Sequence, residues 1–426
     1  MKYLLAILVL SIIIIIHEFG HFVVAKASGV KVVEFSLGMG PRLLKFTRKG
    51  TMYSIKAFLF GGSCQMLGEN SEEDGEGSFN SVSVWKRIAI VAAGPLFNFL
   101  LAFFCAVFFI GKVGYDPVVI NSVKENSAAY EAGLQSGDKI VRINGKKMTF
   151  FGDYTLYMYR NEGTTLNITY IRDGKTYNTT LVPKHITGEV YQLGVTINEK
   201  VEIVDIVSGG SAEKSELKSG DIILCVNGMD ITGQDDIFPA VQSSEGKEMS
   251  VVVNRQGEEI AVKITPDLVT QDYYEYGYSF ADVRVKCSPA GTIKYAFKNV
   301  GYWIKAVFKS LGWLVTGNFK LDDLAGPVGI VTAIGETVEE SRPDGSLYIL
   351  INILNWCIMI NANLGVMNLL PIPAVDGGRL VFLFIEAVRK KPVPREKEGM
   401  VHFVGIVLLM ILMVVVLFND IARLFR

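Results

Sequence analysis

Four long apolar stretches constrain this chain of 426 residues more than any other feature of its sequence. A helix needs about 20 apolar residues to cross the hydrocarbon core of a bilayer. Hydrophobic residues make up 50% of the chain and charged residues only 20%, an apolar excess that soluble cores do not account for. The sequence therefore predicts a polytopic α-helical membrane protein in contact with the lipid bilayer, with four transmembrane helices at residues 1–27, 85–111, 347–371 and 401–419.

Basic residues in the connecting loops give the expected orientation. Lysine and arginine are frequent in residues 28–84 and 372–400, and short loops rich in them stay in the cytoplasm. Because the number of spans is even, both termini and the long segment before the third span should lie outside the cytoplasm. A cleaved signal peptide is the alternative for the first span, since Ala25-Lys26-Ala27 resembles a cleavage site. The polar residues inside this span argue against its removal.

The overall charge and the cysteines argue against two further kinds of function. The 42 basic and 43 acidic residues leave a net charge of -1, too little to attract nucleic acid along the whole chain. The five cysteines are scattered and odd in number, so we expect neither a disulfide framework nor a thiolate metal site. We interpret them as small buried hydrophobic residues.

An HExxH pattern lies inside the first apolar stretch, at His17-Glu18-Phe19-Gly20-His21. Residues four apart share one face of a helix, so both imidazoles can reach one metal ion while Glu18 lies close to the water that the ion binds. Ionisable groups inside a span are costly and usually mark a functional site. Imidazole ligands favour zinc, whose catalytic sites have three protein ligands and one open position. The alternative is a helix end whose polar side chains merely reach the membrane surface.

A third ligand is expected at the cytoplasmic end of the third span. The best candidate is Asp376, which follows Pro371 and Pro373 and precedes Gly377 and Gly378. Prolines and glycines break the helix there, and broken backbone at membrane depth is tolerated where it lines a protein cavity. Both halves of the site would then lie at one depth, near the cytoplasmic side. A plain turn that contains an aspartate is the alternative.

These motifs together resemble the site-2 protease family of intramembrane zinc metalloproteases, and the resemblance covers nearly the whole chain. Gly94-Pro95-Leu96-Phe97-Asn98 is similar to the family's second-helix signature, and the long extracytoplasmic segment is similar to that of the bacterial RseP type. The resemblance implies that His17, His21 and Asp376 bind Zn2+ and that Glu18 is the catalytic general base. It also implies substrate contacts by Asn363, Asn368, Pro371 and Pro373.

Residues 28–84 are expected to form a cytoplasmic loop that contains a β-hairpin. Tyr53, Ile55 and Leu59 fall in an alternating pattern, and residues 38–41 are the predicted turn. An unpaired strand edge is expected nearby, because Gly61 and Gly62 permit close approach of another backbone. A substrate helix must be extended before its peptide bond can be attacked, and strand addition would hold it extended. In the family this region resembles a substrate-clamping, membrane-reentrant β-loop; a purely structural hairpin is the alternative.

The segment between the second and third spans contains an internal repeat. Residues 134–145 match residues 217–228 at an offset of 83, and the same offset carries Tyr191–Gly194 onto Tyr274–Gly277. We therefore expect two consecutive extracytoplasmic α+β domains, at residues 115–199 and 200–287, which resemble circularly permuted PDZ domains. They could bind a peptide as an added strand, or act as a filter that excludes substrates with bulky extracytoplasmic parts. A basic amphipathic helix at residues 288–320 should lie on the membrane surface.

These features predict a multi-pass zinc endopeptidase of the bacterial plasma membrane. The expected substrates are single-span membrane proteins, namely anti-sigma factors after a first extracytoplasmic cut, and remnant signal peptides. One alternative is a metal-binding membrane scaffold or transporter that uses the same residues without hydrolysis. Another is a PDZ-type adaptor with an incidental membrane anchor.

Overall fold

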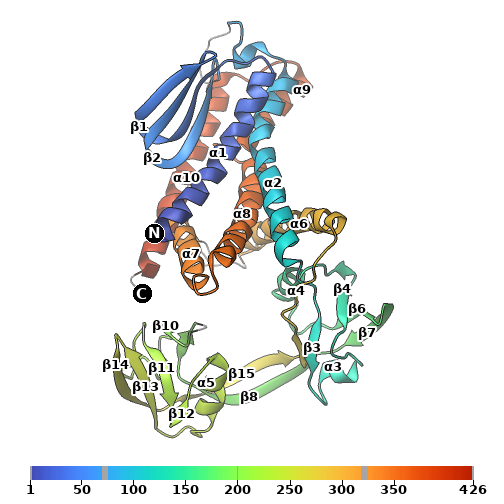
Figure 1. Ribbon diagram of the computed structural model, residues 1–426, viewed down its shortest axis with the longest axis vertical. Coiled ribbons are helices and arrows are strands. Elements are labelled where there is room, and N and C mark those ends of the chain that lie inside the picture. Colours follow the sequence, from blue (N-terminus) through green and yellow to red (C-terminus); the bar gives the residue numbers. More distant parts are fainter. Residues whose placement is uncertain (1, 70–74, 199, 318–324, 425–426) are drawn as a thin grey trace. The chain divides into compact units, whose positions relative to one another are not determined.

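The computed structural model describes residues 2–69, 75–198, 200–317 and 325–424 (Figure 1). The chain divides into two compact units, each described by itself below. The first unit comprises Met1–Pro117, Thr149–Asp153 and Asp282–Leu424, and the second contains Val118–Met148 and Tyr154–Ala281.

Four helices of the first unit are long and apolar enough to cross a membrane, within the part of the chain that the structure describes. They are α1 (Lys2–Ala27), α2 (Val84–Val113), α8 (Ser346–Leu369) and α10 (Arg395–Leu424), and each coincides with a predicted span. α2 packs against both α1 and α8. Its approach to α1 is close, because a β-carbon on Gly20 would lie 2.5 Å from the carbonyl oxygen of Ala93.

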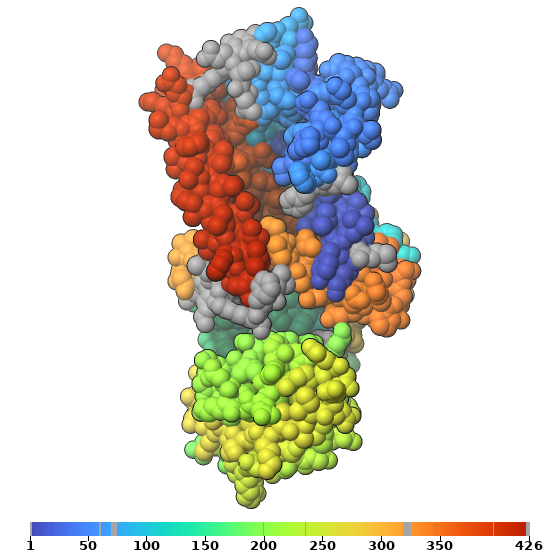
Figure 2. Space-filling view, turned by 90° about the vertical axis from the view of Figure 1, so that its left-hand side faces the viewer, coloured from blue at the N-terminus to red at the C-terminus, as the bar shows by residue number. Residues whose placement is uncertain are grey.

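α10 lies along the outside of this unit, with many of its apolar side chains exposed (Figure 2). One anchor of α10 is the buried Asp420, whose carboxylate accepts backbone hydrogen bonds from Gly326 (3.0 Å) and Gly329 (2.9 Å). Both glycines lie at the start of α7 (Pro327–Glu340). A buried carboxylate there satisfies N–H groups that a helix start leaves unpaired.

Two further helices of the first unit bear on the predictions. α6 (Pro289–Val315) packs on α2 and α8 and falls within the predicted surface segment, of which residues 318–320 lie outside the described residues. α9 (Asp376–Arg389) corrects the expectation that residues 372–400 are a loop. Its apolar side chains do follow a helical pattern, but the prolines before it and the two glycines in its first turn indicate a break in helical structure.

A β-sheet follows α1 along the chain. β1 (Val32–Arg48) and β2 (Thr51–Met66) join at Lys49 and Gly50, whose φ angles of 48° and 75° suit a two-residue hairpin turn. The turn predicted at residues 38–41 is instead a bend inside β1. Gly38 and Gly40 have positive φ there, and the pairing register shifts beside them.

The bend gives this sheet an open edge. Before it, residues 34–37 pair with residues 52–55 and also with residues 62–65. The first half of β1 is therefore internal to the sheet. Among the described residues, the end of β2 pairs on one side only. Such an edge has free backbone groups that can pair with another chain.

The second unit contains the internal repeat as two modules of the same architecture. The first module has a sheet of order β5-β4-β6-β7, and the second has one of order β12-β11-β13-β14. Asp138 pairs with Arg172 in the first module, and Asp221 pairs with Arg255 in the second, both at 2.7 Å. The repeated Gly-Asp sequence thus places one buried carboxylate in each module. The elements are α3 (Ala128–Glu131), β4 (Lys139–Ile143), β5 (Lys146–Lys147), α4 (Phe151–Met158), β6 (Leu166–Arg172), β7 (Lys175–Leu181), β11 (Ile222–Val226), β12 (Met229–Asp230), α5 (Gln234–Gln242), β13 (Met249–Arg255) and β14 (Glu258–Ile264).

The second module is inserted into the first, which corrects the expectation of two consecutive domains. β16 (Tyr278–Phe280) pairs with β3 (Ile120–Val123), so residues that follow the second module complete the first. Tyr276, Tyr278 and Phe280 pack on the core of the first module, whereas Tyr191, Val195 and Ile197 pack on that of the second. β9 (Val195–Ile197) and β10 (Ile203–Ile206) pair within the second module.

A two-stranded ribbon carries the chain out of the first module and back. β8 (Lys184–Gln192) and β15 (Asp267–Glu275) pair antiparallel along all nine residues of each strand. The sequence does not reveal which Tyr-Gly segment belongs to which module, because the two segments share one pattern. Either segment is compatible with either module by pattern alone.

Candidate metal centre

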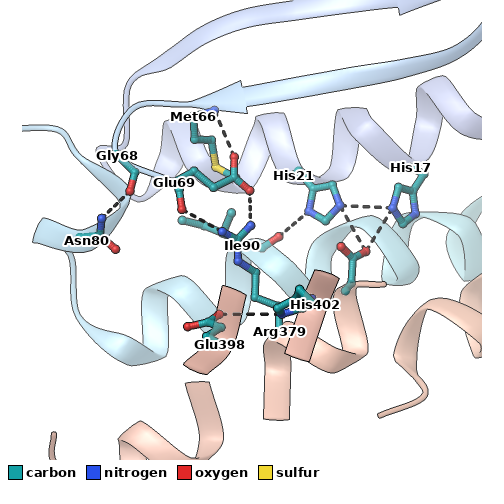
Figure 3. Close-up of polar contacts among 11 residues, drawn as sticks. His17, His21, Met66, Gly68, Glu69, Asn80, Ile90, Arg379, Glu398 and His402 are labelled. Atoms are coloured by element: carbon teal, nitrogen blue, oxygen red, sulfur yellow. Dashed lines mark hydrogen bonds and ion pairs between the residues drawn. The ribbon is translucent and has the colours of Figure 1, made fainter. Parts of the chain in front are cut away.

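The two histidines of α1 face one another (Figure 3), and the first residue of α9, Asp376, contacts both. His17 and His21 are buried, one helical turn apart, and their Nε2 atoms are 3.2 Å apart. Oδ2 of Asp376 lies 3.1 Å from Nε2 of His17 and 3.4 Å from Nε2 of His21. The structure thus brings together the three ligands that the sequence predicts.

The spacing of these donor atoms fits a zinc ion. Ligands about 2.0–2.2 Å from a tetrahedral zinc ion lie about 3.3 Å from one another. The observed separations of 3.1, 3.2 and 3.4 Å are close to this value. Two imidazole nitrogens and one carboxylate oxygen also leave the fourth position of the ion open, as catalytic zinc sites require.

Gly94 of α2 makes room for both imidazole rings. A β-carbon at this position would lie 2.3 Å from Nε2 of His21 and 2.8 Å from Cε1 of His17. No other residue type fits without moving a ring. The sequence motif around Gly94 was expected from the family resemblance, but this reason for the glycine is visible only in the structure.

Hydrogen bonds to the other ring nitrogens orient the imidazoles. Nδ1 of His21 lies 2.9 Å from the carbonyl oxygen of Ile90, and Nδ1 of His17 lies 3.1 Å from the side-chain amide of the fully buried Asn98. A carbonyl only accepts, so Nδ1 of His21 carries the proton and Nε2 is free for a metal. The sequence reasoning missed both contacts. The Ile90 contact is made by backbone and leaves no sequence signal, whereas Asn98 is visible as a polar residue inside an apolar span.

Glu18 faces a cavity of about 390 Å³ that it shares with the histidines and with the end of β2. The backbone N–H of Cys64 donates a hydrogen bond to the Glu18 carboxylate. A β-carbon on Gly62 would lie 3.3 Å from Cγ of Glu18. The open edge of β2 therefore runs directly beside Glu18. Burial raises the pKa of the Cys64 thiol, so the neutral form of Cys64 is favoured. A neutral thiol is a poor metal ligand and does not compete with the histidines for the ion.

A compact turn presents Asp376 at the start of α9. A β-carbon on Gly377 would lie 2.0 Å from the carbonyl oxygen of Leu370, and one on Gly378 would lie 2.4 Å from that of Ile372. The backbone N–H of Ala374 donates to Nδ1 of His402 on α10 at 3.0 Å. The chain can therefore fold this tightly before the aspartate only with glycines at both positions.

The other predicted substrate residues do not line the cavity beside the two histidines. Asn363 and Pro371 are exposed and Asn368 is half-buried, while Pro373 packs against Gly405 of α10. Gly61 packs against Met39 rather than Glu18. Among the described residues that line the cavity of the histidines, none of these five is present.

The site combines two histidines one turn apart, a glutamate between them and an aspartate from another helix. In a protein with four helices of membrane-spanning length, these residues define the class of membrane-embedded metallopeptidases. Comparison with known proteins agrees with this class. The model of peptidase family M50 matches residues 5–412. The chain therefore belongs to peptidase family M50 and is a zinc metalloprotease of the site-2 type.

Curated relatives match along almost their whole length. The chain is 31% identical to the zinc metalloprotease RasP of Geobacillus kaustophilus, with 98% of this chain and 97% of the relative covered. It is 32% identical to the regulator of sigma-E protease RseP of Escherichia coli and 30% identical to the regulator of sigma-W protease RasP of Bacillus subtilis, with 98% of both chains covered in each case. The solved HtrA-type protease AlgW overlaps 36% of this chain and 55% of its own at 13% identity and a TM-score of 0.21, too low to support an argument about the modules.

Proposed function

We propose that His17, His21 and Asp376 bind the catalytic zinc ion and that Glu18 is the general base. The convergence of three donor atoms within 3.4 Å beside Glu18 supports this assignment most directly. Zinc, when bound, lowers the pKa of a coordinated water and polarises the carbonyl of the scissile bond. Glu18 takes a proton from the attacking water and passes it to the leaving amine.

The variant Glu18→Gln tests this assignment. An amide cannot accept the proton, so turnover of a single-span substrate should fall by about 10²–10⁴-fold. The zinc content of purified Glu18→Gln should equal that of wild type, because the three ligands remain. His17→Ala, in contrast, should lose zinc and turnover together. Undiminished turnover by zinc-loaded Glu18→Gln would exclude Glu18 as the base.

We further propose that the open edge of β2 binds an unwound substrate as an added strand. This edge runs beside Glu18, so a strand paired to it would pass the metal centre with its peptide bonds extended. Gly61 and Gly62, which lie in this edge strand, are proposed to contact the backbone of the substrate. Asn363, Asn368, Pro371 and Pro373 are proposed to contact the substrate next to this strand, on the strength of the family resemblance.

The proposed substrates are single-span membrane proteins of the anti-sigma factor type, after a first extracytoplasmic cut, and remnant signal peptides. The relatives named as regulators of sigma-E and sigma-W proteases support the first class. The basic residues of segments 28–84 and 372–400 support an active site near the cytoplasmic side of a bacterial plasma membrane. Both termini and both modules would then be extracytoplasmic.

For the two modules we propose a role as a size filter, with PDZ-like peptide capture as the alternative. β9 and β16 follow the two Tyr-Gly segments and are the strands to which a peptide would add. A variant without residues 193–266 separates the two roles. A filter that needs the second module predicts that this variant cleaves an untrimmed substrate, whereas peptide capture at β9 predicts that it loses cleavage of the trimmed one. The family and the named relatives are proteases, so a non-proteolytic scaffold or transporter is set aside.

A further inference from the structure

An ion pair between Glu69 and Arg379 joins the end of β2 to α9 (Figure 3). Nη1 of Arg379 contacts Oε1 of Glu69, and Nη2 donates to the backbone carbonyl oxygen of Glu69 at 2.9 Å. The second carboxylate oxygen of Glu69 accepts the N–H of Met66, the last residue of β2, at 3.3 Å. Arg379 therefore contacts both the side chain and the main chain of Glu69, which in turn is bonded to the last residue of the edge strand.

Arg379 is also fixed relative to the metal centre. It follows Asp376 by three residues on the first turn of α9, so ligand and guanidinium belong to one rigid element. The ring of Phe79 lies 5.4 Å from the guanidinium carbon. The side chains of Arg379 and Glu69 are only 23% and 15% exposed. A stacked guanidinium that donates through two nitrogens is better ordered than an ordinary surface ion pair.

The pair lies where two cavities meet. Glu69, Asp376 and Arg379 line the cavity of about 390 Å³ around Glu18, and also a cavity of about 920 Å³ lined by residues of α9 and α10. Glu386 of α9 forms a second ion pair, with Arg87 of α2. Both residues line the larger cavity but not the smaller one. This pair joins two helices and does not involve β2. The Glu386–Arg87 pair is therefore a matched control for the Glu69–Arg379 pair.

We propose that Arg379 is a positioning residue that determines which peptide bond of the substrate is cut; this rests on the strand addition proposed above. A β-strand advances about 3.3 Å per residue. A shift of the edge by that distance relative to Asp376 brings the neighbouring peptide bond to the metal centre. Pairing with residues 34–37 holds the edge within its own sheet. The Glu69–Arg379 pair fixes that edge relative to α9.

The test uses the full-length protein in lipid nanodiscs and a synthetic single-span substrate, an apolar segment of about 20 residues with Asn and Gly at its centre. The masses of the two products identify the bond that is cut. Wild type should cut one bond. Arg379→Ala and Glu69→Gln should spread the cuts over neighbouring bonds at unchanged zinc content, and Arg379→Lys should spread them less. Glu386→Gln should unfold at a lower temperature than wild type but still cut the single wild-type bond.

The following results would contradict either the positioning role of Arg379 or the proposed function. If Arg379→Ala and Glu69→Gln cut the wild-type bond alone, or if Glu386→Gln spreads the cuts equally, Arg379 does not set the position. A complete loss of cleavage in zinc-loaded Glu69→Gln would replace positioning by a direct catalytic role. If wild type does not cut, or cuts no faster than Glu18→Gln, the proposed function fails instead. Cleavage that depends on Glu18 but not on Arg379 rejects only the positioning role.

Discussion

Gly94 illustrates how little space surrounds the two histidines. Gly94→Ala places a methyl group 2.3 Å from Nε2 of His21, so the ring must leave its position. We expect this variant to purify without zinc and without protease activity, as measured by metal analysis and cleavage of a single-span substrate. Gly111→Ala on the same helix is the control, because its β-carbon would lie 3.6 Å from Thr292, an ordinary contact. Stoichiometric zinc in Gly94→Ala would contradict this geometry.

We expect Asn98 to affect zinc affinity through its contact with His17. The structure places Nδ2 of Asn98 next to Nδ1 of His17 and leaves the buried Oδ1 of Asn98 without a hydrogen-bond partner. If Nε2 of His17 binds zinc, Nδ1 carries the proton, so the amide of Asn98 must be turned over for its oxygen to accept that proton. Loss of such a contact lowers metal affinity by about 10–100-fold. We expect this loss for Asn98→Ala in a chelator competition, and much less for Asn98→Asp, which keeps an acceptor. Asn361→Ala is a control, because this buried asparagine of α8 bonds to the carbonyl oxygen of Cys357 instead. Equal affinities in Asn98→Ala and wild type would show that the amide does not support the ligand.

At the scale of elements, the β1–β2 sheet depends on the charge of Glu34. Arg42 donates two hydrogen bonds to this buried carboxylate and is the main cause that lowers its pKa from 4.5 to about 2; Ser54 adds a third. A carboxylate with a lowered pKa stabilises the fold above its unfolded pKa, and this contribution disappears as the pH falls from about 4.5 to about 2.

We therefore expect Glu34→Gln to expose the sheet to hydrogen exchange at neutral pH. The difference from wild type should shrink as the pH falls below about 4.5, where Glu34 is half protonated in the unfolded chain. Comparison of both proteins at each pH removes the intrinsic effect of pH on exchange. A difference between the two proteins that stays constant down to about pH 2 would show that the Glu34 charge does not stabilise the sheet.

The elements also differ in how well the sequence predicts them. The four spans are visible because each is a long run of apolar residues. The helix α9 is not predicted, although its sequence is amphipathic, because it begins directly after a proline-rich turn and has two glycines in its first turn. The bend in β1 is misread as a turn, because glycines with positive φ serve both purposes. The true turn at Lys49-Gly50 has only one glycine to indicate it.

At the scale of the whole molecule, the inserted second module leads to a deletion experiment. Gln192 and Asp267 face each other in the ribbon, so an Asn-Gly turn can join them after residues 193–266 are removed. This deletion keeps β16, and we expect the first module to stay folded. Deletion of residues 200–287, at the predicted domain boundary, removes β16 and three aromatic side chains of the core. Each such loss costs about 3–5 kcal/mol, against a total stability of about 5–15 kcal/mol. Limited proteolysis within residues 118–181 distinguishes the two deletions; equal resistance would contradict the nesting.

The residues of the candidate metal centre could be predicted from sequence because their chemistry is carried by rare residue types at fixed spacing. His17, His21 and Asp376 are conspicuous in apolar or helix-breaking surroundings. The contacts that support them could not be predicted in the same way. The Ile90 carbonyl is a backbone group, and Glu69 and Arg379 are 310 residues apart in the chain. Only packing of α1, α2, α9 and the sheet brings such groups together.

The nesting of the modules also bears on how such a chain can change in evolution. Recombination between the two copies of the repeat would delete 83 residues and join Tyr191 to Glu275. Since Lys184 and Glu275 are paired neighbours in the ribbon, residues 185–191 would become a short loop between them. β16 would still close onto β3, and the first module would remain complete. A gene with this arrangement can therefore lose one module, or gain one by duplication, in a single step that leaves an intact fold.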